Sequence, residues 1–164
     1  MARLSIRTWP DPVLASKCAP VGAVGEDIRR LAADMLETMY AAEGRGLAAP
    51  QVGRPLRLFV MDEAWKEAAP APRVFVDPEI LWSSPEVAAM EEGCLSIPGI
   101  AVRVERPVRI RLRWRDLDGT SHEEEMDGFV ATCAQHETDH LDGIVTLDRV
   151  DGETRQALIA EYSA

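Results

Sequence analysis

Cysteine is scarce in this chain, which has three of them in 164 residues. An odd and sparse set does not make a disulfide framework, and it fits a reducing compartment. The sequence also lacks any apolar run near the roughly 20 residues that a membrane-spanning helix needs. Its first residues carry no hydrophobic core of a signal peptide. We therefore expect a cytoplasmic protein without a membrane partner.

Basic residues are in the minority as well. Lysine and arginine number 18 against 28 aspartates and glutamates, so the formal net charge is −10 at pH 7. Non-specific binding to nucleic acid needs a basic surface, so a nucleic-acid partner is not expected. A length of 164 residues is typical of one domain with one core. We expect residues 1–164 to form a single domain and to act as a monomer.

Hydrophobic periodicity predicts one helix and two short strands in the first half of the chain. Residues 26–43 are expected to form an amphipathic helix that stops at Gly44. Its apolar stripe comprises Ile28, Leu31, Met35, Leu36 and Met39. Residues 56–61 and 73–76 are typical of short strands. The alanine- and proline-rich residues 63–72 between them are expected to form a surface loop.

A hairpin is predicted on the two sides of the Asp116-Leu117-Asp118-Gly119 turn. Residues 108–115 alternate apolar side chains with arginines, which is typical of a strand with one buried face. The row of arginines could suggest a nucleic-acid surface. Residues 123–125 are all glutamates, however, and lie where the opposing strand would face the row; such pairs contribute roughly 0.2–1 kcal/mol each. A solvated, ion-paired face is favoured, with His122 exposed beside it.

The most informative segment is His136-Glu137-Thr138-Asp139-His140. Residues four apart lie on one face of an α-helix, so both imidazoles can reach one cation. Glu137 lies about 100° round the helix and flanks that cation. We predict a helix that starts near Asp127 and ends at Gly143. The segment indicates a metal site with a candidate base, and a polar surface helix with two unrelated histidines is the alternative.

A catalytic metal site needs a third protein ligand and an open position. Cys94 is a candidate because it ends a probable strand, although a lone cysteine is more often a small buried apolar residue. Cys133 lies on the same helix stripe as the two histidines, but a fourth protein ligand would close the site. A third segment, Gly44–Gln51, reads as a glycine-rich loop that lets a ligand or a backbone approach closely.

Together these segments resemble the peptide deformylases. That family is marked by Gly-x-Gly-Leu-Ala-Ala-x-Gln, Glu-Gly-Cys-Leu-Ser and Gln-His-Glu-x-Asp-His, in this order. The chain has all three, at Gly44–Gln51, Glu92–Ser96 and Gln135–His140. The likeness extends from Arg7–Leu14 to about Val150. It implies an α+β fold in which mostly antiparallel sheets pack around a central metal-binding helix, with an N-terminal helix.

The resemblance also implies roles for individual residues. Cys94, His136 and His140 would bind one divalent metal, most often Fe(II) in this family, although Zn(II), Ni(II) and Co(II) suit the same ligands. Glu137 would act as general base and then acid, and Gln51 and the Leu95 backbone N–H would stabilise the oxyanion. The implied substrate-binding residues, with Gly46 leaving space for the substrate backbone, are Gly44, Arg45, Gly46, Glu92, Gly93, Phe129, Thr132 and Cys133.

The implied activity is hydrolysis of the N-formyl group on the N-terminal methionine of nascent polypeptides, a step of protein biosynthesis. One alternative is a related hydrolase that acts on another N-formyl or N-acyl compound. A non-enzymatic protein with a structural metal is disfavoured, because such a site needs neither Glu137 nor Gln51 and prefers four protein ligands. An endopeptidase of the His-Glu-x-x-His type would want a downstream glutamate or histidine ligand, and no histidine follows His140.

Two features depart from the usual family pattern. Arg45 and Thr132 are polar where many deformylases have aliphatic residues, beside the pocket for the methionine side chain. We expect Arg45 either to narrow and polarise that pocket or to point into solvent. Residues 151–164 are expected to form a short acidic helix capped by Asp151, whereas some family members carry a basic tail that can dock on the ribosome. A ribosome contact therefore stays open.

Overall fold

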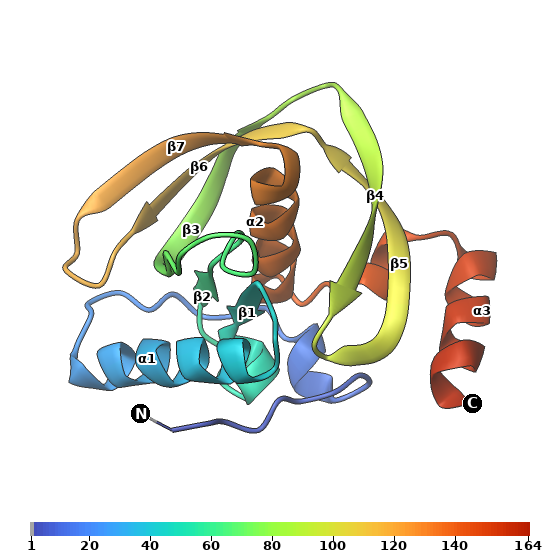
Figure 1. Ribbon diagram of the computed structural model, residues 1–164, viewed down its shortest axis with the longest axis horizontal. Coiled ribbons are helices and arrows are strands. Elements are labelled where there is room, and N and C mark those ends of the chain that lie inside the picture. Colours follow the sequence, from blue (N-terminus) through green and yellow to red (C-terminus); the bar gives the residue numbers. More distant parts are fainter. Residues whose placement is uncertain (1) are drawn as a thin grey trace.

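The computed structural model describes residues 2–164, which form three α-helices, three short 3₁₀ helices and seven strands (Figure 1). The helices are α1 (Glu26–Ala41), α2 (Gly128–Leu141) and α3 (Gly152–Ser163), and the 3₁₀ helices are η1 (Pro12–Ala15), η2 (Ala49–Val52) and η3 (Thr146–Arg149). The strands are β1 (Gly46–Ala48), β2 (Leu58–Met61), β3 (Arg73–Ser83), β4 (Val87–Cys94), β5 (Ile97–Pro107), β6 (Arg109–Arg115) and β7 (Ser121–Asp127).

Two antiparallel sheets surround α2. One sheet has five strands in the order β1-β2-β3-β6-β7, and the other is the β4-β5 hairpin. Figure 1 shows α2 standing between the two sheets, with α1 running beneath β1 and β2 and α3 on the outer side of β5. The predicted α+β architecture, with mostly antiparallel sheets around a central helix and an N-terminal helix, is confirmed.

Helix α1 forms where the apolar stripe predicted it. Four residues of the stripe are buried in one hydrophobic cluster with β1 and β2, whereas Leu36 is only partly buried; the four are Ile28, Leu31, Met35 and Met39. The helix ends at Ala41, and the left-handed residue after it is Glu43, with a φ of 58°. The expected stop at Gly44 was therefore wrong, since the chain reverses one residue earlier.

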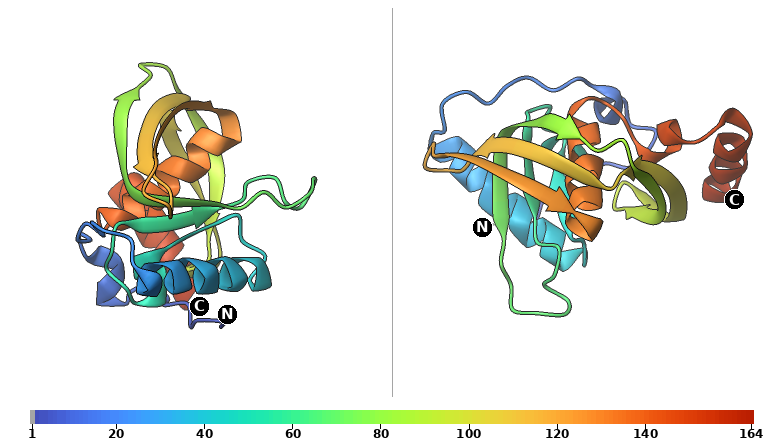
Figure 2. Two further views of the ribbon diagram at one scale, coloured as in Figure 1. Left: turned by 90° about the vertical axis from the view of Figure 1, so that its left-hand side faces the viewer. Right: turned by 90° about the horizontal axis from the view of Figure 1, so that it is seen from above.

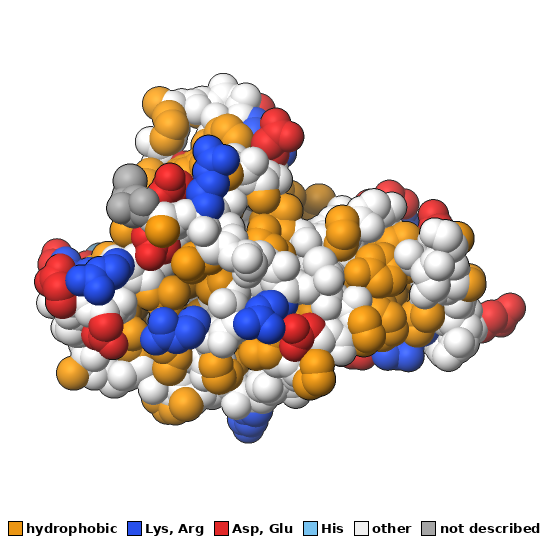
Figure 3. Space-filling view, turned by 90° about the horizontal axis from the view of Figure 1, so that it is seen from below, with side chains coloured by type: hydrophobic (Ala, Val, Ile, Leu, Met, Phe, Trp, Pro, Cys, Tyr) orange, Lys and Arg blue, Asp and Glu red, His pale blue; other side chains and the backbone are white. Residues whose placement is uncertain are grey.

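The hairpin of β6 and β7 confirms the ion-paired face. The apolar side chains of β6 are buried in the core, and the arginines between them are turned outward. Arg111 contacts the carboxylates of Glu123 and Glu125 at 3.2 and 3.6 Å. His122 is exposed and stacks on Trp114. On the face drawn in Figure 3, lysine and arginine side chains are scattered among acidic ones instead of forming a continuous basic patch.

Three predicted elements differ from the structure in extent or type. β2 begins at Leu58 and not at residue 56, because Leu56 makes only an isolated bridge to Ala19. β3 continues well beyond residue 76, because shifts of register after Val76 let it bend and stay paired with β6. The expected glycine-rich loop, Gly44–Gln51, contains β1 and η2 instead, since its apolar residues pair with β2.

The remaining predicted elements lie where they were expected. α2 spans all but the ends of the predicted metal-binding helix, and Asp151 caps α3 by accepting a hydrogen bond from the Thr154 N–H at 2.7 Å. Residues 62–72 form a loop that projects from the body between β2 and β3 (Figure 2). Within residues 2–164, no helix has the length and apolar character needed to cross a membrane.

Candidate metal centre and substrate cavity

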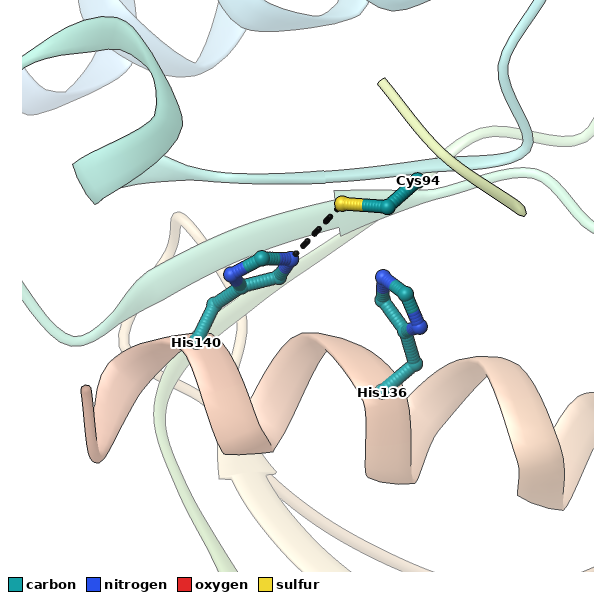
Figure 4. A group of neighbouring side chains, drawn as sticks. All are labelled: Cys94, His136 and His140. Carbon is teal, nitrogen blue, oxygen red and sulfur yellow. Dashed lines mark hydrogen bonds between the residues drawn. The ribbon is translucent and has the colours of Figure 1, made fainter. Parts of the chain in front are cut away.

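Two elements bring the three predicted metal ligands together. His136 and His140 lie one turn apart on α2, and Cys94 is the last residue of β4. Figure 4 shows both imidazoles rising from the same side of α2 towards the cysteine sulfur. The Cys94 Sγ lies 3.4 Å from the His140 Nε2, and one candidate ligand atom from each residue lies within 4.8 Å of the other two.

This group has the properties of a transition-metal site. Both histidines are buried, and burial lowers the pKa of His140, so that its ring is neutral and can offer a lone pair. Two imidazoles and one thiolate are the donors that Fe(II), Zn(II), Co(II) and Ni(II) accept in proteins. Three protein ligands also leave a coordination position open, as in catalytic sites. The residues present therefore fit a divalent metal.

A buried carboxylate fixes the orientation of His136. The His136 Nδ1 donates to the Glu92 Oε1 at 2.9 Å, which leaves the other ring nitrogen for the metal. Arg106 in turn donates two hydrogen bonds to Glu92, at 2.7 and 2.9 Å, and a third to Asp139 at 2.8 Å. Burial alone would raise the pKa of Glu92, but its bonds with His136 and Arg106 hold that pKa below the usual value.

Glu137 is the candidate proton carrier. Its side chain is buried, and its Oε1 has no hydrogen-bond partner among residues 2–164. Burial raises the pKa of Glu137 to about 7, and a divalent cation beside it would favour the ionised form. A carboxylate without a partner next to the metal ligands is free to accept a proton from a bound molecule.

Glycine at position 46 is explained by Glu137. A Cβ on Gly46 would lie 2.6 Å from the Glu137 Oε2, which is closer than two such atoms can approach. The expectation that Gly46 leaves space for the substrate backbone was therefore incomplete, because the first contact that requires glycine is with the protein's own carboxylate. Gly44 has a similar role, since its Cβ would lie 2.7 Å from a methyl carbon of Leu95.

The amide of Gln51 is held in one orientation. Its Oε1 accepts from the Ala48 N–H at 2.9 Å, so the amide nitrogen must point the other way. That nitrogen donates to the Ser96 Oγ at 3.0 Å and lies 3.6 Å from the Cys94 Sγ. The Gln51 amide nitrogen therefore contacts the residues on either side of Leu95, which lies in the turn after β4.

A cavity of about 610 Å³ opens beside the metal ligands, which is a usual size for a small-molecule or peptide side-chain site. It brings together nearly all the predicted site residues. Those that line it are Gly44, Arg45, Gly46, Gln51, Glu92, Gly93, Cys94, Leu95, Phe129, Cys133, His136 and Glu137. His140 does not line the cavity, and its ring lies next to the Cys94 sulfur in Figure 4.

Thr132 and Glu92 differ from the expectation that they bind substrate. Thr132 does not line the cavity; its hydroxyl donates to the Gly128 carbonyl at 3.3 Å and lies 3.4 Å from the sulfur of Met90. The next residue, Cys133, faces the cavity instead, because one step along a helix turns a side chain by about 100°. Glu92 reaches the cavity, but its carboxylate is occupied by His136 and Arg106.

Arg45 lies at the cavity wall, and its side chain is partly exposed. Its guanidinium makes two hydrogen bonds to the Glu67 carboxylate, at 2.9 and 2.7 Å, and lies 5.4 Å above the ring of Phe129. Arg45 therefore lies on the cavity wall, and its effect on the pocket stays a prediction. Its positive charge is paired, however, which the sequence did not indicate.

Some contributors to this site were not found from the sequence. Ser96 belongs to a recognised motif, and its small polar side chain was the available signal for a partner to Gln51. Asp139 is likewise inside a motif, and its partner Arg149 donates two bonds to it at 2.6 and 3.0 Å. Arg106 and Glu67 carried no signal, because each comes from a segment with ordinary surface composition.

Known proteins share both the sequence and the fold. Residues 3–156 match the model of the polypeptide deformylase family. A peptide deformylase from Afipia carboxidovorans is 48% identical over 163 residues, covering 99% of this chain and 95% of the relative. Another, from Nitrobacter hamburgensis, is 46% identical over 167 residues, with 99% and 95% covered.

Solved structures agree. The peptide deformylase from Ehrlichia chaffeensis in complex with actinonin superposes with a TM-score of 0.92 at 38% identity, covering 98% of this chain and 96% of that one. The peptide deformylase from Thermotoga maritima gives a TM-score of 0.86 at 42% identity, with 92% and 99% covered. With three motifs gathered around one cavity and relatives matched over nearly their whole length, the chain belongs to the polypeptide deformylase family.

Proposed function

We propose that this protein is a metal-dependent hydrolase that removes the formyl group from the N-terminal methionine of nascent polypeptides. One observation carries the proposal. Three metal ligands, an unpartnered buried carboxylate and an oriented amide converge on one end of a cavity large enough for a peptide terminus. The relatives that this chain matches over nearly their whole length are peptide deformylases.

Cys94, His136 and His140 would hold the metal. When bound, a divalent cation supplies Lewis-acid chemistry, which polarises a carbonyl and lowers the pKa of water from ~16 towards ~7. We favour Fe(II), which suits imidazole and thiolate ligands, and Co(II), Ni(II) and Zn(II) fit the same donor set. Elemental analysis of protein purified without oxygen identifies the metal that the cell supplies.

Glu137 is proposed to move the proton. Its unpartnered Oε1 can accept a proton from the attacking water and then return it to the amine that leaves. A bound cation would favour the ionised form that accepts the proton, whereas burial, which raises the pKa of Glu137, favours the protonated form that returns it. The close contact with Gly46 limits where this carboxylate can move.

Gln51 and Leu95 are proposed to stabilise the oxyanion that forms when the formyl carbon becomes tetrahedral. The Gln51 amide is already oriented by Ala48 and Ser96, so it needs no rearrangement to donate a hydrogen bond. The Leu95 backbone N–H follows directly after the ligand Cys94. One donor of this kind is typically worth about 3–4 kcal/mol of the barrier.

The other lining residues are proposed to bind the peptide. Gly93 leaves open space beside Cys94, since nothing lies within 4 Å of where its Cβ would be. Cys133 and Phe129 continue the cavity along α2, away from Glu137. Burial raises the pKa of Cys133, so its thiol is neutral and suits an apolar side chain of the substrate.

The decisive experiment measures formate release from formyl-Met-Ala-Ser by protein loaded with Fe(II) under anaerobic conditions. Glu137→Gln keeps the shape of the side chain but cannot carry the proton, so we expect turnover to fall by about 10²–10⁴-fold with metal content unchanged. Undiminished turnover in the variant would contradict the role of Glu137. Bound metal without formate release by the native protein would favour a different N-formyl or N-acyl substrate.

We also propose a cytoplasmic location, action as a monomer and binding to an N-formylated peptide, as the sequence led us to expect. A ribosome contact through α3 is not favoured, because that helix presents Glu153 and Glu161 against the single cation Arg155. Ribosomal RNA attracts basic segments and repels acidic ones. Salt-sensitive co-sedimentation of the protein with ribosomes would overturn this inference.

A further inference from the structure

Arg45 has an unusual position for a cation. It lies between Gly44 and β1, and its side chain is 25% exposed at the wall of the substrate cavity. The guanidinium uses one nitrogen to donate to the Glu63 carbonyl and to Glu67, and the other to donate to Glu67. A two-bond pairing of this kind is geometrically specific. Arg45 is therefore held in one place and not free to reach a ligand.

Phe129 supports the guanidinium from below. The Arg45 Cζ lies 5.4 Å from the centre of the Phe129 ring, which is within the range of a cation–π contact. Phe129 is 43% exposed, a high value for a large apolar residue. We call Arg45, Glu67 and Phe129 the arginine clasp.

The projecting loop is anchored so that Glu67 reaches Arg45. The Asp62 N–H donates to the Arg45 carbonyl at 2.9 Å, and the Trp65 Nε1 donates to the Gly44 carbonyl at 2.8 Å. Trp65 also packs edge-on against Tyr40, with ring centres 5.2 Å apart. These contacts hold the first residues of the loop against residues 44 and 45. The clasp is thus prearranged by the fold.

The arginine clasp lies at the end of the cavity away from the metal-ligand histidines. Phe129 precedes His136 by seven residues on α2, which corresponds to about 10 Å along the helix axis. Both residues line the same cavity. A peptide with its formyl group at Glu137 would therefore direct a side chain, and not its scissile bond, towards the clasp.

The charge of Arg45 is neutralised at this end of the cavity, and the residues around the clasp are slightly acidic. Arg45 and Glu67 cancel each other, since a glutamate is ionised at neutral pH and the hydrogen bonds from Arg45 hold the pKa of Glu67 still lower. The other ionisable residues that line the cavity away from the metal ligands are Lys66, Glu43 and Glu91, which sum to −1 (one positive and two negative charges). An acidic side chain entering here would meet no unpaired arginine.

We propose that the arginine clasp determines which first residue the cavity accepts, with Glu67 neutralising Arg45 so that uncharged side chains are favoured and acidic ones are rejected. The proposal rests on the proposed function and goes beyond it by assigning specificity to a residue of the projecting loop. Arg45 contributes a flat wall stacked on Phe129, whereas its charge is available to a substrate only when Glu67 is absent.

The test compares kcat/KM for formyl-Met-Ala-Ser and formyl-Glu-Ala-Ser in the Fe(II)-loaded protein. Glu67→Gln keeps the length of the side chain and removes its charge, and Glu67 is 63% exposed, so the fold tolerates the change. We expect the ratio of kcat/KM for the two peptides to shift roughly five-fold towards formyl-Glu, which is the largest effect typical of one partly exposed ion pair. This shift should become smaller at high salt, because salt screens the charge of Arg45. Glu63→Gln is the matched control, because its carboxylate faces Arg73 instead.

A double-mutant cycle assigns the effect to the pair. In an Arg45→Met background, we expect Glu67→Gln to change the preference little, since no cation remains to be released. An unchanged preference in Glu67→Gln, or an equal shift with and without Arg45, would overturn the proposal.

A binding measurement tests the role of the arginine clasp independently of the proposed hydrolysis. The dissociation constants of Met-Ala-Ser and Glu-Ala-Ser, measured by NMR titration, should show the same shift between native and Glu67→Gln protein. If the native protein released no formate but the binding preference moved as expected, the proposed function would fail and the clasp would stand. If the native protein released formate but the binding preference did not differ between native and Glu67→Gln protein, only the proposal for the arginine clasp would be refuted.

Discussion

At the scale of single residues, the space beside Glu137 is limited by the chain itself. Gly46 approaches the Glu137 carboxylate so closely that no side chain fits between them, and Glu137 as a whole residue is 5% exposed. The same crowding is absent at Gly93, although both glycines belong to recognised motifs. A motif glycine can therefore serve either a close contact or open space, and the distances decide which.

Gly46→Ala should displace the Glu137 carboxylate while leaving the metal ligands in place. A misplacement of about 1 Å near the reacting atoms can cost on the order of 10²-fold in rate, so we expect a loss of that size in formate release. Metal content and the unfolding transition should change little. Gly152→Ala, where nothing lies within 4 Å of the added Cβ, is the control. Full activity in Gly46→Ala would show that Glu137 can move aside.

Glu92 is expected to act through His136. Glu92→Gln would remove the charge that Arg106 pairs with and weaken the hold on the His136 ring. Loss of a residue that orients a metal ligand typically lowers metal affinity by 10–100-fold. Competition with a chelator measures this loss, and Glu91→Gln, the exposed neighbour, is the matched control. Equal affinity in the two variants would contradict the assignment.

At the scale of elements, α2 and the β4-β5 hairpin form the metal site between them. One supplies both histidines and Glu137, and the other supplies Cys94 and Glu92. The end of α2 is held by Gly143, whose φ is 76° and whose Cβ would lie 2.6 Å from the Ala15 carbonyl oxygen. The position of this helix end therefore depends on close backbone packing against η1.

Gly143→Ala should destabilise the protein more than Gly119→Ala. Both glycines have a left-handed φ, which costs a non-glycine residue roughly 1–2 kcal/mol, but nothing lies within 4 Å of an added Cβ at Gly119. The clash with the Ala15 backbone adds to that cost only at Gly143. Urea denaturation gives the free energy of unfolding for each variant. An equal loss of unfolding free energy in the two variants would mean that η1 shifts to make room for the added methyl group without an energetic penalty.

At the scale of the whole molecule, α2 packs on the five-stranded sheet through apolar side chains and contacts the β4-β5 hairpin through polar ones. Around the metal ligands the interior is polar, and the ion pairs of Glu92, Arg106 and Asp139 are buried there. Polar groups buried this way stabilise the fold only when every partner is present. A bound metal would complete the set by joining β4 to α2.

Metal loading should therefore raise the melting temperature. A ligand present at 1,000 times its dissociation constant stabilises the folded state by about 4 kcal/mol, which corresponds to roughly 8–16 °C for a domain of this size. Differential scanning calorimetry with and without Co(II) measures the shift. The shift should be lost in His140→Ala and kept in His122→Ala, because the exposed His122 ring pairs with Asp116 and is not one of the three grouped ligands. A shift retained in His140→Ala would place the metal elsewhere.

The sequence alone determined the parts of this protein that depend on local spacing. Four-residue spacing placed His136 and His140 on one helix face, the apolar stripe located α1, and alternation located β6. The motifs identified the family and the residues that meet at the metal. These inferences succeeded because helix and strand periods constrain neighbours within a few residues of one another.

Only the tertiary structure decided which distant groups complete the site. Glu92 meets His136 across 44 residues of sequence, and Arg45 meets Glu67 across 22. It also showed that Thr132 turns away from the cavity, that Gly46 makes room for Glu137 and that β3 extends past residue 76. No local pattern encodes such contacts, because they arise when α2, the β4-β5 hairpin and the projecting loop pack together, and each segment is compatible with many partners until they do.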